Sequence, residues 1–161
     1  FKASLENCGN ALVIQTRIVD ADPKNAFAAG ALGRTRRYRG NTLLKMGNAD
    51  QALAEYRVAA ELFDKLLAID PTNASKKASL AESYSLLGDA LSLSPKNKSV
   101  NGGACEWFQK SLTLWQDIGS AGQLSSEYLD KTGNIQEKIA NCELAAAKSL
   151  KSANLTRFRK R

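Results

Sequence analysis

Polar and basic side chains recur at helical spacing near the start of the chain. They follow one another at intervals of three, four and four: Arg34, Arg37, Asn41 and Lys45. These intervals place the four side chains, called here the anion face, on one side of a helix. Arginine offers a carboxylate a rigid fork of donors, and an asparagine one turn on adds a neutral donor. The anion face therefore has the chemistry to bind an acidic or C-terminal carboxylate; the commoner alternative is a solvated helix face.

Other kinds of chemistry have little support. There is no histidine, and the three cysteines Cys8, Cys105 and Cys142 are far apart and form no CxxC pair. Zinc sites need clustered ligands, and a reactive thiol needs an activating neighbour. The cysteines are expected to be free thiols that act as small hydrophobic side chains in a reducing cytoplasm. No carboxylate dyad can be placed either, so we expect no enzyme activity, no metal and no cofactor.

The positive charge is concentrated at one end. The net charge is +7, but residues 151–161, "KSANLTRFRKR", hold five basic residues and no acidic one. The body of the chain is therefore close to neutral, and a basic tail alone is weak evidence for nucleic acid. A helical array that binds nucleic acid through this tail and the Arg34–Arg39 cluster is the second hypothesis. The sequence disfavours it, because a continuous basic stripe with exposed aromatic residues is missing.

An internal repeat indicates how the anion face is positioned. "DPKNA" at 22–26 recurs as "DPTNA" at 70–74, an offset of 48 that aligns Gly40 with Gly88. Four extra residues then shift the offset to 52 and align Tyr56 with Phe108. Each copy has the apolar period of two helices. In the first copy we expect one helix at about 26–46 and a second that ends near residue 69, and in the second copy we expect helices at 74–93 and 102–118. Residues 1–21 form a partial earlier copy.

Small residues recur where two helices of a pair must meet. In "GNTLLKMGNADQALAEYRVA", Gly40 and Ala52 allow close approach, Tyr56 fills the space beside them, and Ala59 admits the following helix. Gly47 is expected to end one helix, and Asn73 to begin another. Arg36 and Arg39 depart from this apolar pattern, because the second copy has Tyr84 and Leu87 in their places.

This spacing resembles the tetratricopeptide repeat (TPR), with second helices about two turns longer than usual. "AESYSLLGDAL", "EWFQKSLTLWQDI" and "EKIANCELA" further resemble the C-terminal TPR region of bacterial, eukaryotic-like serine/threonine protein kinases. The resemblance covers roughly residues 22–147. It implies a cytoplasmic regulatory or scaffolding module that binds a peptide or protein on the helix face carrying Arg37 and Asn41. Ser85 and Asp89, their second-copy counterparts, do not continue that site.

The predicted fold class is all-α: a TPR-like α-solenoid of antiparallel helix pairs, with five or six helices in all. The predicted repeats are 1–21 (partial), 22–69 and 70–118. A Gly/Ser-rich connector is expected at 117–134, a capping helix at about 134–150 and a poorly packed basic tail at 151–161. The polar stretch 94–103 is expected to be a linker or a functional loop. Together, 1–150 form one domain.

Trp107 is a further candidate contact residue, because it aligns with Glu55 at a polar position, whereas Phe108 and Trp115 align with core positions. No apolar run is long enough to span a bilayer. The chain begins without a methionine or a signal peptide and is expected to be a piece of a longer protein. Homo-oligomerisation and a purely structural spacer role are both compatible with the sequence.

Overall fold

The computed structural model describes residues 1–94, 101–122 and 126–158, with only the backbone described for 101–102, 126–128 and 149–158. Six helices make up this part of the chain: α1 (Lys2–Ala21), α2 (Ala26–Lys45), α3 (Ala49–Ile69), α4 (Ala74–Leu93), α5 (Asn101–Ser120) and α6 (Ser126–Phe158). No strand occurs among these residues, and the predicted all-α class is confirmed.

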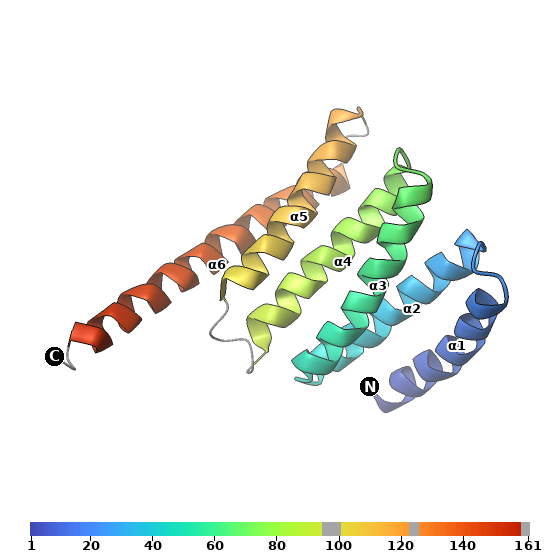
Figure 1. Ribbon diagram of the computed structural model, residues 1–161, viewed down its shortest axis with the longest axis horizontal. Helices are drawn as coiled ribbons and strands as arrows, with labels where there is room; N and C mark the ends of the chain where they lie inside the picture. Colours follow the sequence, from blue (N-terminus) through green and yellow to red (C-terminus); the bar gives the residue numbers. More distant parts are fainter. Residues whose placement is uncertain (95–100, 123–125, 159–161) are drawn as a thin grey trace.

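The helices lie side by side in chain order, and each turns back along the one before it (Figure 1). The main contacts between elements join consecutive helices only, from α1 against α2 through to α5 against α6. Helices α1 and α6 therefore lie at opposite ends of the row (Figure 1). One side of this row is formed mainly by α2, α4 and α6.

Local signals in the sequence set the helix boundaries. The Asn25 side chain accepts a hydrogen bond from the Ala28 amide at 2.9 Å, and Asn73 accepts one from Lys76 at 3.1 Å. Both asparagines thus satisfy an amide that the first turn leaves without a partner. Gly47 has φ of +80° just after α2, and the next amide returns to the Leu43 carbonyl at 2.9 Å. The predicted helix end at Gly47 and the start at Asn73 are both confirmed.

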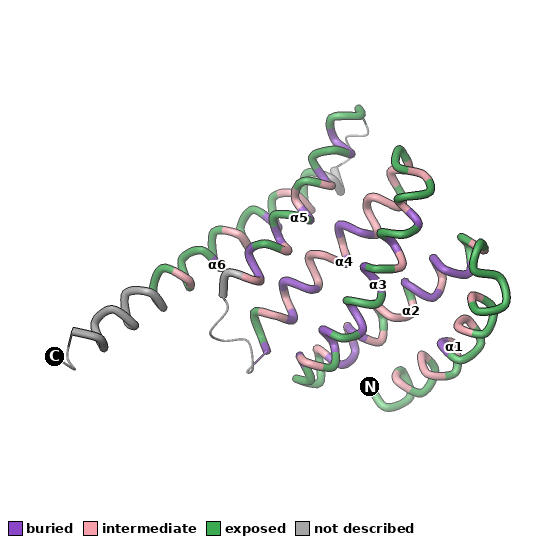
Figure 2. Tube along the Cα trace, viewed as in Figure 1, coloured by how far each residue is buried: buried purple, intermediate pink, exposed green. Residues whose placement is uncertain are grey.

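Apolar side chains form two neighbouring cores. The first joins α2, α3 and α4 around Tyr56, Phe63 and Leu87, and the second joins α4, α5 and α6 around Phe108 and Trp115. Burial follows the facing sides of the helices, and the outer sides are exposed (Figure 2). The apolar stripe of α3, which recurs at helical spacing in the sequence, faces inward: Ala52, Tyr56, Ala59, Phe63 and Leu66 are buried, and Leu67 is half-buried. Phe108 and Trp115 are core residues as predicted.

An aromatic ring packs directly on a glycine in each of two helix pairs, called here the first pair (α2 and α3) and the second pair (α4 and α5). A Cβ atom built on Gly40 would overlap the ring of Tyr56, and one built on Gly88 would overlap the ring of Phe108. The two rings therefore lie directly on glycine backbone, where any side chain would exclude them. The structure confirms the expected close approach at Gly40, and it repeats that approach at Gly88.

The predicted connector at 117–134 was wrong over most of its length. Helix α5 continues to Ser120, and α6 begins at Ser126, well before the capping helix predicted at 134–150. Gly133 lies inside α6 with no atom within 4 Å of a built Cβ. An exposed glycine costs a helix only about 1 kcal/mol, and the ion pair of Lys131 with Glu82 at 3.0 Å anchors this turn.

Helix α6 also runs past residue 150, up to Phe158, into the segment expected to be a tail. The side chains of 151–161 lie outside the described residues, so their poor packing stays a prediction. Most of the polar stretch 94–103 is outside as well, although Asn101–Gly103 form the first turn of α5.

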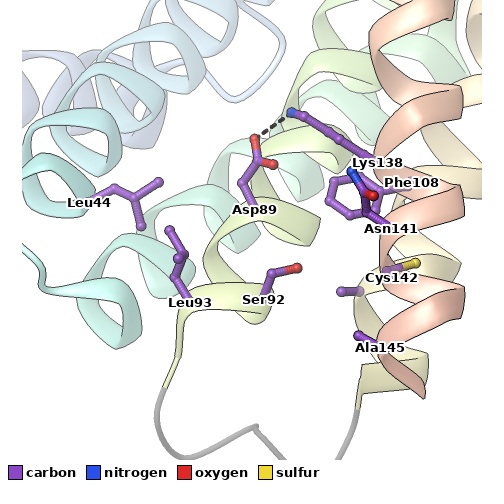
Figure 3. Close-up of a pocket in the computed structure, with 10 residues that line it drawn as sticks. Leu44, Asp89, Ser92, Leu93, Phe108, Lys138, Asn141, Cys142 and Ala145 are labelled. Atoms are coloured by element: carbon purple, nitrogen blue, oxygen red, sulfur yellow. Dashed lines mark hydrogen bonds and ion pairs between the residues drawn. The ribbon is translucent and has the colours of Figure 1, made fainter. Parts of the chain in front are cut away.

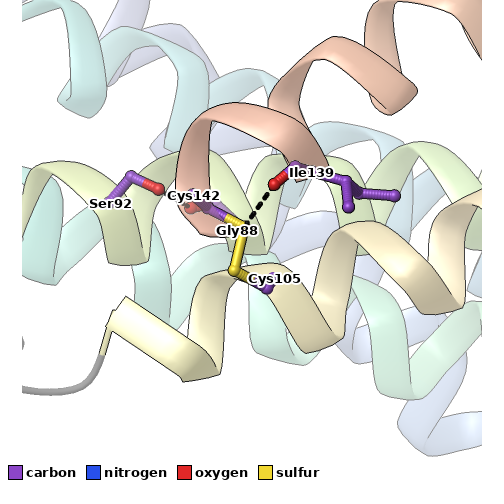
Figure 4. Close-up of a disulfide and its surroundings, with 5 residues drawn as sticks. All are labelled: Gly88, Ser92, Cys105, Ile139 and Cys142. Carbon is purple, nitrogen blue, oxygen red and sulfur yellow. Dashed lines mark hydrogen bonds between the residues drawn. A yellow bond between two sulfur atoms is a disulfide. The ribbon is translucent and has the colours of Figure 1, made fainter. Parts of the chain in front are cut away.

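The expectation of three free cysteines was wrong for two of them. Cys105 of α5 and Cys142 of α6 form a disulfide across 37 residues of sequence, with 5.7 Å between their Cα atoms (Figure 4). Neither cysteine belongs to a recognisable spacing motif, and only the packing of α6 on α5 brings them together. Cys8 is free and half-buried, in agreement with the prediction.

Candidate functional site

Arg37 of the predicted anion face is already held by groups of this chain. Its guanidinium pairs with Glu82 of α4 at 2.5 Å, donates to the Ser79 carbonyl at 3.4 Å and lies 5.1 Å from the centre of the Phe63 ring. The side chain keeps 13% of its surface exposed. Arg37 therefore ties α2 to α4, and a ligand carboxylate would have to share it with Glu82.

Asn41 has an internal partner as well. Its Oδ1 accepts a hydrogen bond from the Tyr56 hydroxyl at 2.7 Å. Burial, assisted by the charge of Asp89, raises the pKa of Tyr56 far above its ordinary value, so this hydroxyl remains a donor. The amide nitrogen of Asn41 is the group left to meet a ligand, which agrees with the donor role predicted for it.

The other two members of the anion face, Arg34 and Lys45, are exposed. In the described part of the chain neither has a carboxylate within 4 Å. Arg34 lines a hollow between α2 and α4, which also includes Phe27, Phe63 and Ser79. The structure thus places the four predicted residues along α2, with Arg34 and Lys45 at the two ends of the anion face and Arg37 and Asn41 engaged between them.

A second hollow, of about 300 Å³, lies further along the same side of the molecule, between α2, α4 and α6. Asn41, Glu82 and Lys131 contribute to its lining. Burial alone would raise the pKa of Glu82. The hydrogen bond from Lys131 and the charges of Arg37 and Lys131 outweigh burial and hold that pKa below its ordinary value. Glu82 is therefore a carboxylate shared between α2 and α6.

The third hollow has a volume of about 470 Å³ and is the most apolar of these three. Figure 3 shows its lining residues. Its lining is mostly carbon, and a few polar groups lie among it: Leu44, Asp89, Ser92, Leu93, Ala104, Phe108, Lys138, Asn141, Cys142 and Ala145. Lys138 pairs with Asp89 at 2.8 Å and lies 5.5 Å from the centre of the Phe108 ring. This hollow, called here the Phe108 hollow, combines an apolar floor with an ammonium group at its edge.

The three hollows follow one another along α2, α4 and α6, the second and third sharing Asp89 and Lys138, and are called here together the α2–α4–α6 groove. Sequence reasoning found its α2 side and missed its α6 side, where Lys131 and Lys138 lie. Lys131 was assigned to a connector, and Lys138 to a capping helix without a role. Their spacing of seven residues, two helical turns, is the signal that could have placed both on one face.

Trp107 is not part of this groove. It lies on α5, half-buried, with its ring centre 5.2 Å from that of Tyr84 and the Lys110 ammonium 4.4 Å away. The hollow that it lines belongs to α3, α4 and α5. The structure therefore separates Trp107 from the anion face.

Among the described residues, no group of three or more His, Cys, Asp or Glu side chains is arranged to hold a metal ion. None of the helices described has the length and apolar character needed to cross a bilayer.

Comparisons with known proteins add no identity: no protein-family model, no curated protein and no solved structure matches the chain significantly.

Proposed function

We propose that the chain is a non-catalytic interaction module, a TPR-like solenoid of antiparallel helix pairs that binds a peptide or protein partner. The observation that carries the proposal is the α2–α4–α6 groove, which combines an apolar hollow with basic groups along its length. Support for the repeat architecture comes from the two aromatic rings that pack on glycine and from contacts between consecutive helices.

The ligand that this groove suits best is a peptide with a free carboxylate close to an apolar side chain. The Phe108 hollow is of the size range that takes apolar groups, and Lys138 stands at its edge. Arg34 and Lys45 add unpaired positive charge further along α2, and the amide of Asn41 adds a donor. Arg37 supports these groups mainly by positioning, since it holds α2 against α4.

The rival proposal, a nucleic-acid-binding array, loses part of its basis. Arg36 and Arg39 both pair with Glu55, at 3.1 and 2.6 Å, and Arg37 pairs with Glu82. Three members of the Arg34–Arg39 cluster therefore already pair with carboxylates of this chain. The basic residues of 151–161 remain available to that hypothesis.

The resemblance to kinase-associated repeats leads us to propose a regulatory or scaffolding region of a larger bacterial signalling protein, such as a serine/threonine kinase. The cytoplasmic location inferred from the sequence rested partly on free cysteines and partly on this resemblance. The Cys105–Cys142 disulfide removes the first of these supports, because disulfides persist mainly in oxidising compartments.

A peptide library with free C-terminal carboxylates, matched to an amidated copy of the same library, tests the function. Hits are measured by fluorescence polarisation against wild type, Arg34→Glu and the control Lys65→Glu, an exposed change on α3. We expect the free carboxylate to be preferred, and Arg34→Glu to weaken binding about tenfold, equivalent to 1.4 kcal/mol.

Equal binding to both libraries would overturn the carboxylate preference. Binding that is unchanged in Arg34→Glu would place the site outside the groove. A salt titration on a labelled oligonucleotide separates the rival, because phosphate contacts give a steep dependence of affinity on salt.

A further inference from the structure

A separate hollow of about 240 Å³ opens between α3, α4 and α5. Its lining combines two aromatic rings, an apolar floor and charged groups: Arg57, Ala60, Glu61, Asp64, Tyr84, Leu87 and Trp107. Tyr84 and Leu87 lie on the side of α4 opposite to Ser85 and Asp89, because α-helical residues advance by about 100° each. This hollow, called here the Trp107 hollow, is therefore on the other face of the molecule from the α2–α4–α6 groove.

The aromatic wall of the hollow already attracts a cation. The rings of Tyr84 and Trp107 lie 5.2 Å apart with 48° between their planes. The Lys110 ammonium lies 4.4 Å from the centre of the Trp107 ring, well within the range of a cation–π interaction. Indole is the aromatic side chain that binds cations most strongly. The wall thus has the electronic character of a cation-binding surface, and Lys110 occupies part of it.

Two carboxylates stand at the rim. Glu61 and Asp64 are three residues apart on α3, which places them on the same side of the helix, and both are exposed. Neither has an ion-pair partner within 4 Å in the part of the chain that the structure describes. Burial and then the charge of Asp64 raise the pKa of Tyr84, so this carboxylate acts on the aromatic wall. Arg57 adds a positive charge to the lining, besides the Lys110 ammonium that lies over the Trp107 ring.

We propose that the Trp107 hollow binds the arginine side chain of a partner protein. A guanidinium is planar and weakly hydrated, stacks on aromatic rings and pairs with carboxylates through two parallel hydrogen bonds. Tyr84 and Trp107 supply the stacking surface, and Glu61 and Asp64 supply the acceptors. A hollow of 240 Å³ is smaller than the usual pocket for a whole small molecule and suits a single side chain.

The test uses the full chain with ¹⁵N-labelled tryptophan, and N-acetyl-arginine amide as the probe. The neutral isostere N-acetyl-citrulline amide is the matched control, and N-acetyl-lysine amide tests the choice of cation. We expect arginine amide to shift the indole N–H signal of Trp107 in a saturable way and to leave that of the buried Trp115 unchanged. Citrulline amide should bind at least fivefold more weakly, and lysine amide at least threefold more weakly.

Variants of the rim decide the electrostatic part. Asp64→Asn removes one charge without a change of shape and should weaken binding of arginine amide about threefold. Arg57→Gln removes one of the two competing cations and should strengthen binding by a similar factor, while Lys65→Gln, on the same helix outside the lining, should change nothing. Equal shifts with arginine and citrulline, equal binding of lysine, or weaker binding in Arg57→Gln would each overturn the proposal.

Discussion

The two helix pairs share their geometry but differ in the chemistry of one cluster. In the first pair, Arg36 and Arg39 of α2 flank Glu55 of α3. In the second pair the equivalent positions of α4 and α5 hold Tyr84, Leu87 and Trp107. Three residues that are separated in sequence thus change together, from a triad of ions to an apolar cluster.

This difference explains why the first leading helix is less apolar than its repeat position predicts. Glu55 is 8% exposed, and its two carboxylate oxygens are each taken by a different arginine. The two arginines therefore share one carboxylate in a place that the second pair fills with largely apolar side chains. The packing of an aromatic ring on glycine, in contrast, is the same in both pairs. This packing sets how closely the two helices of a pair approach each other, whereas the side chains elsewhere in their contact can be either ionic or apolar.

The pairs also differ in how the second helix is joined to the next one. Leu53 of α3 is buried against its neighbours, and the equivalent residue of α5 is Cys105, bonded to Cys142 of α6. Cys105→Ala with Cys142→Ala should lower the free energy of unfolding by about 3 kcal/mol, because a cross-link over 37 residues restricts the unfolded chain. Denaturant unfolding with and without a thiol reductant measures the loss.

Reductant should destabilise the wild type and leave the double variant unchanged. Cys8→Ala is the matched control, since Cys8 forms no disulfide. A wild type that is insensitive to reductant would mean that the bridge does not hold α6 in place.

The ion triad gives the next largest effect. Glu55→Ala leaves two arginines close together with no carboxylate between them, and should cost about 2 kcal/mol, less than a fully buried pair because Arg39 keeps 37% of its side chain exposed. Thermal unfolding measures the change. The sharper version transplants the second pair's cluster into the first, as Arg36→Tyr, Arg39→Leu and Glu55→Trp together.

The triple variant should recover most of the stability lost in Glu55→Ala, since buried ion pairs and apolar replacements of similar volume are often equivalent. If the triple variant is less stable than Glu55→Ala, the two clusters are not interchangeable and the comparison between the pairs fails.

The packing of an aromatic ring on glycine, which both pairs share, should be equally sensitive to substitution in the two pairs. Gly40→Ala and Gly88→Ala would each force a methyl group into a ring, at a cost of roughly 1–3 kcal/mol that a gain in helix propensity of about 1 kcal/mol partly offsets. Gly133→Ala is the control: it has open space around it and should stabilise α6 slightly. Chemical unfolding of the three variants compares them. A large loss at only one of Gly40 and Gly88 would show that the pairs are not equivalent.

Much of the fold could be predicted because the signals for it are local. The asparagine caps, Gly47 and the apolar stripe of α3 each specify structure within a few residues. Where the signals are not local, prediction failed. Gly133 and its serine-rich neighbours suggested a connector, yet packing and the Lys131–Glu82 pair keep the segment helical. The disulfide depends on how α6 lies against α5, which spacing in the sequence does not reveal.

The candidate site also has a part that could be predicted from local signals and a part that could not. The period of Arg34, Arg37, Asn41 and Lys45 placed them correctly on one helix, since helical period is a property of the chain alone. The partners of Arg37 and Asn41 lie on α4 and α3, and only the tertiary structure shows that both side chains are already engaged.

The smallest effect concerns the contact between the pairs, where Glu82 joins Arg37 of α2 to Lys131 of α6. The pKa of Glu82 is lowered in the folded protein. Burial alone would raise this pKa, but the hydrogen bond from Lys131 and the positive charges of Arg37 and Lys131 together outweigh burial. A lowered folded-state pKa stabilises the fold above the unfolded-state pKa, near 4.3, and this stabilisation is lost as pH falls through the folded-state value.

We therefore expect Glu82→Gln to remove part of the acid-induced loss of stability below about pH 4.5, and to lower stability at pH 7 by less than about 1 kcal/mol, because the carboxylate is one-third exposed. Melting temperatures of wild type and Glu82→Gln from pH 7 to pH 3 test this, with Glu61→Gln, an exposed carboxylate outside any ion pair described, as the control. The difference between wild type and Glu82→Gln should narrow as pH falls. A difference in melting temperature that stays constant over this range would show that Glu82 acts through its shape and not through its charge. The ion pairs of Glu82 would then contribute nothing to the contacts between the first pair, the second pair and α6.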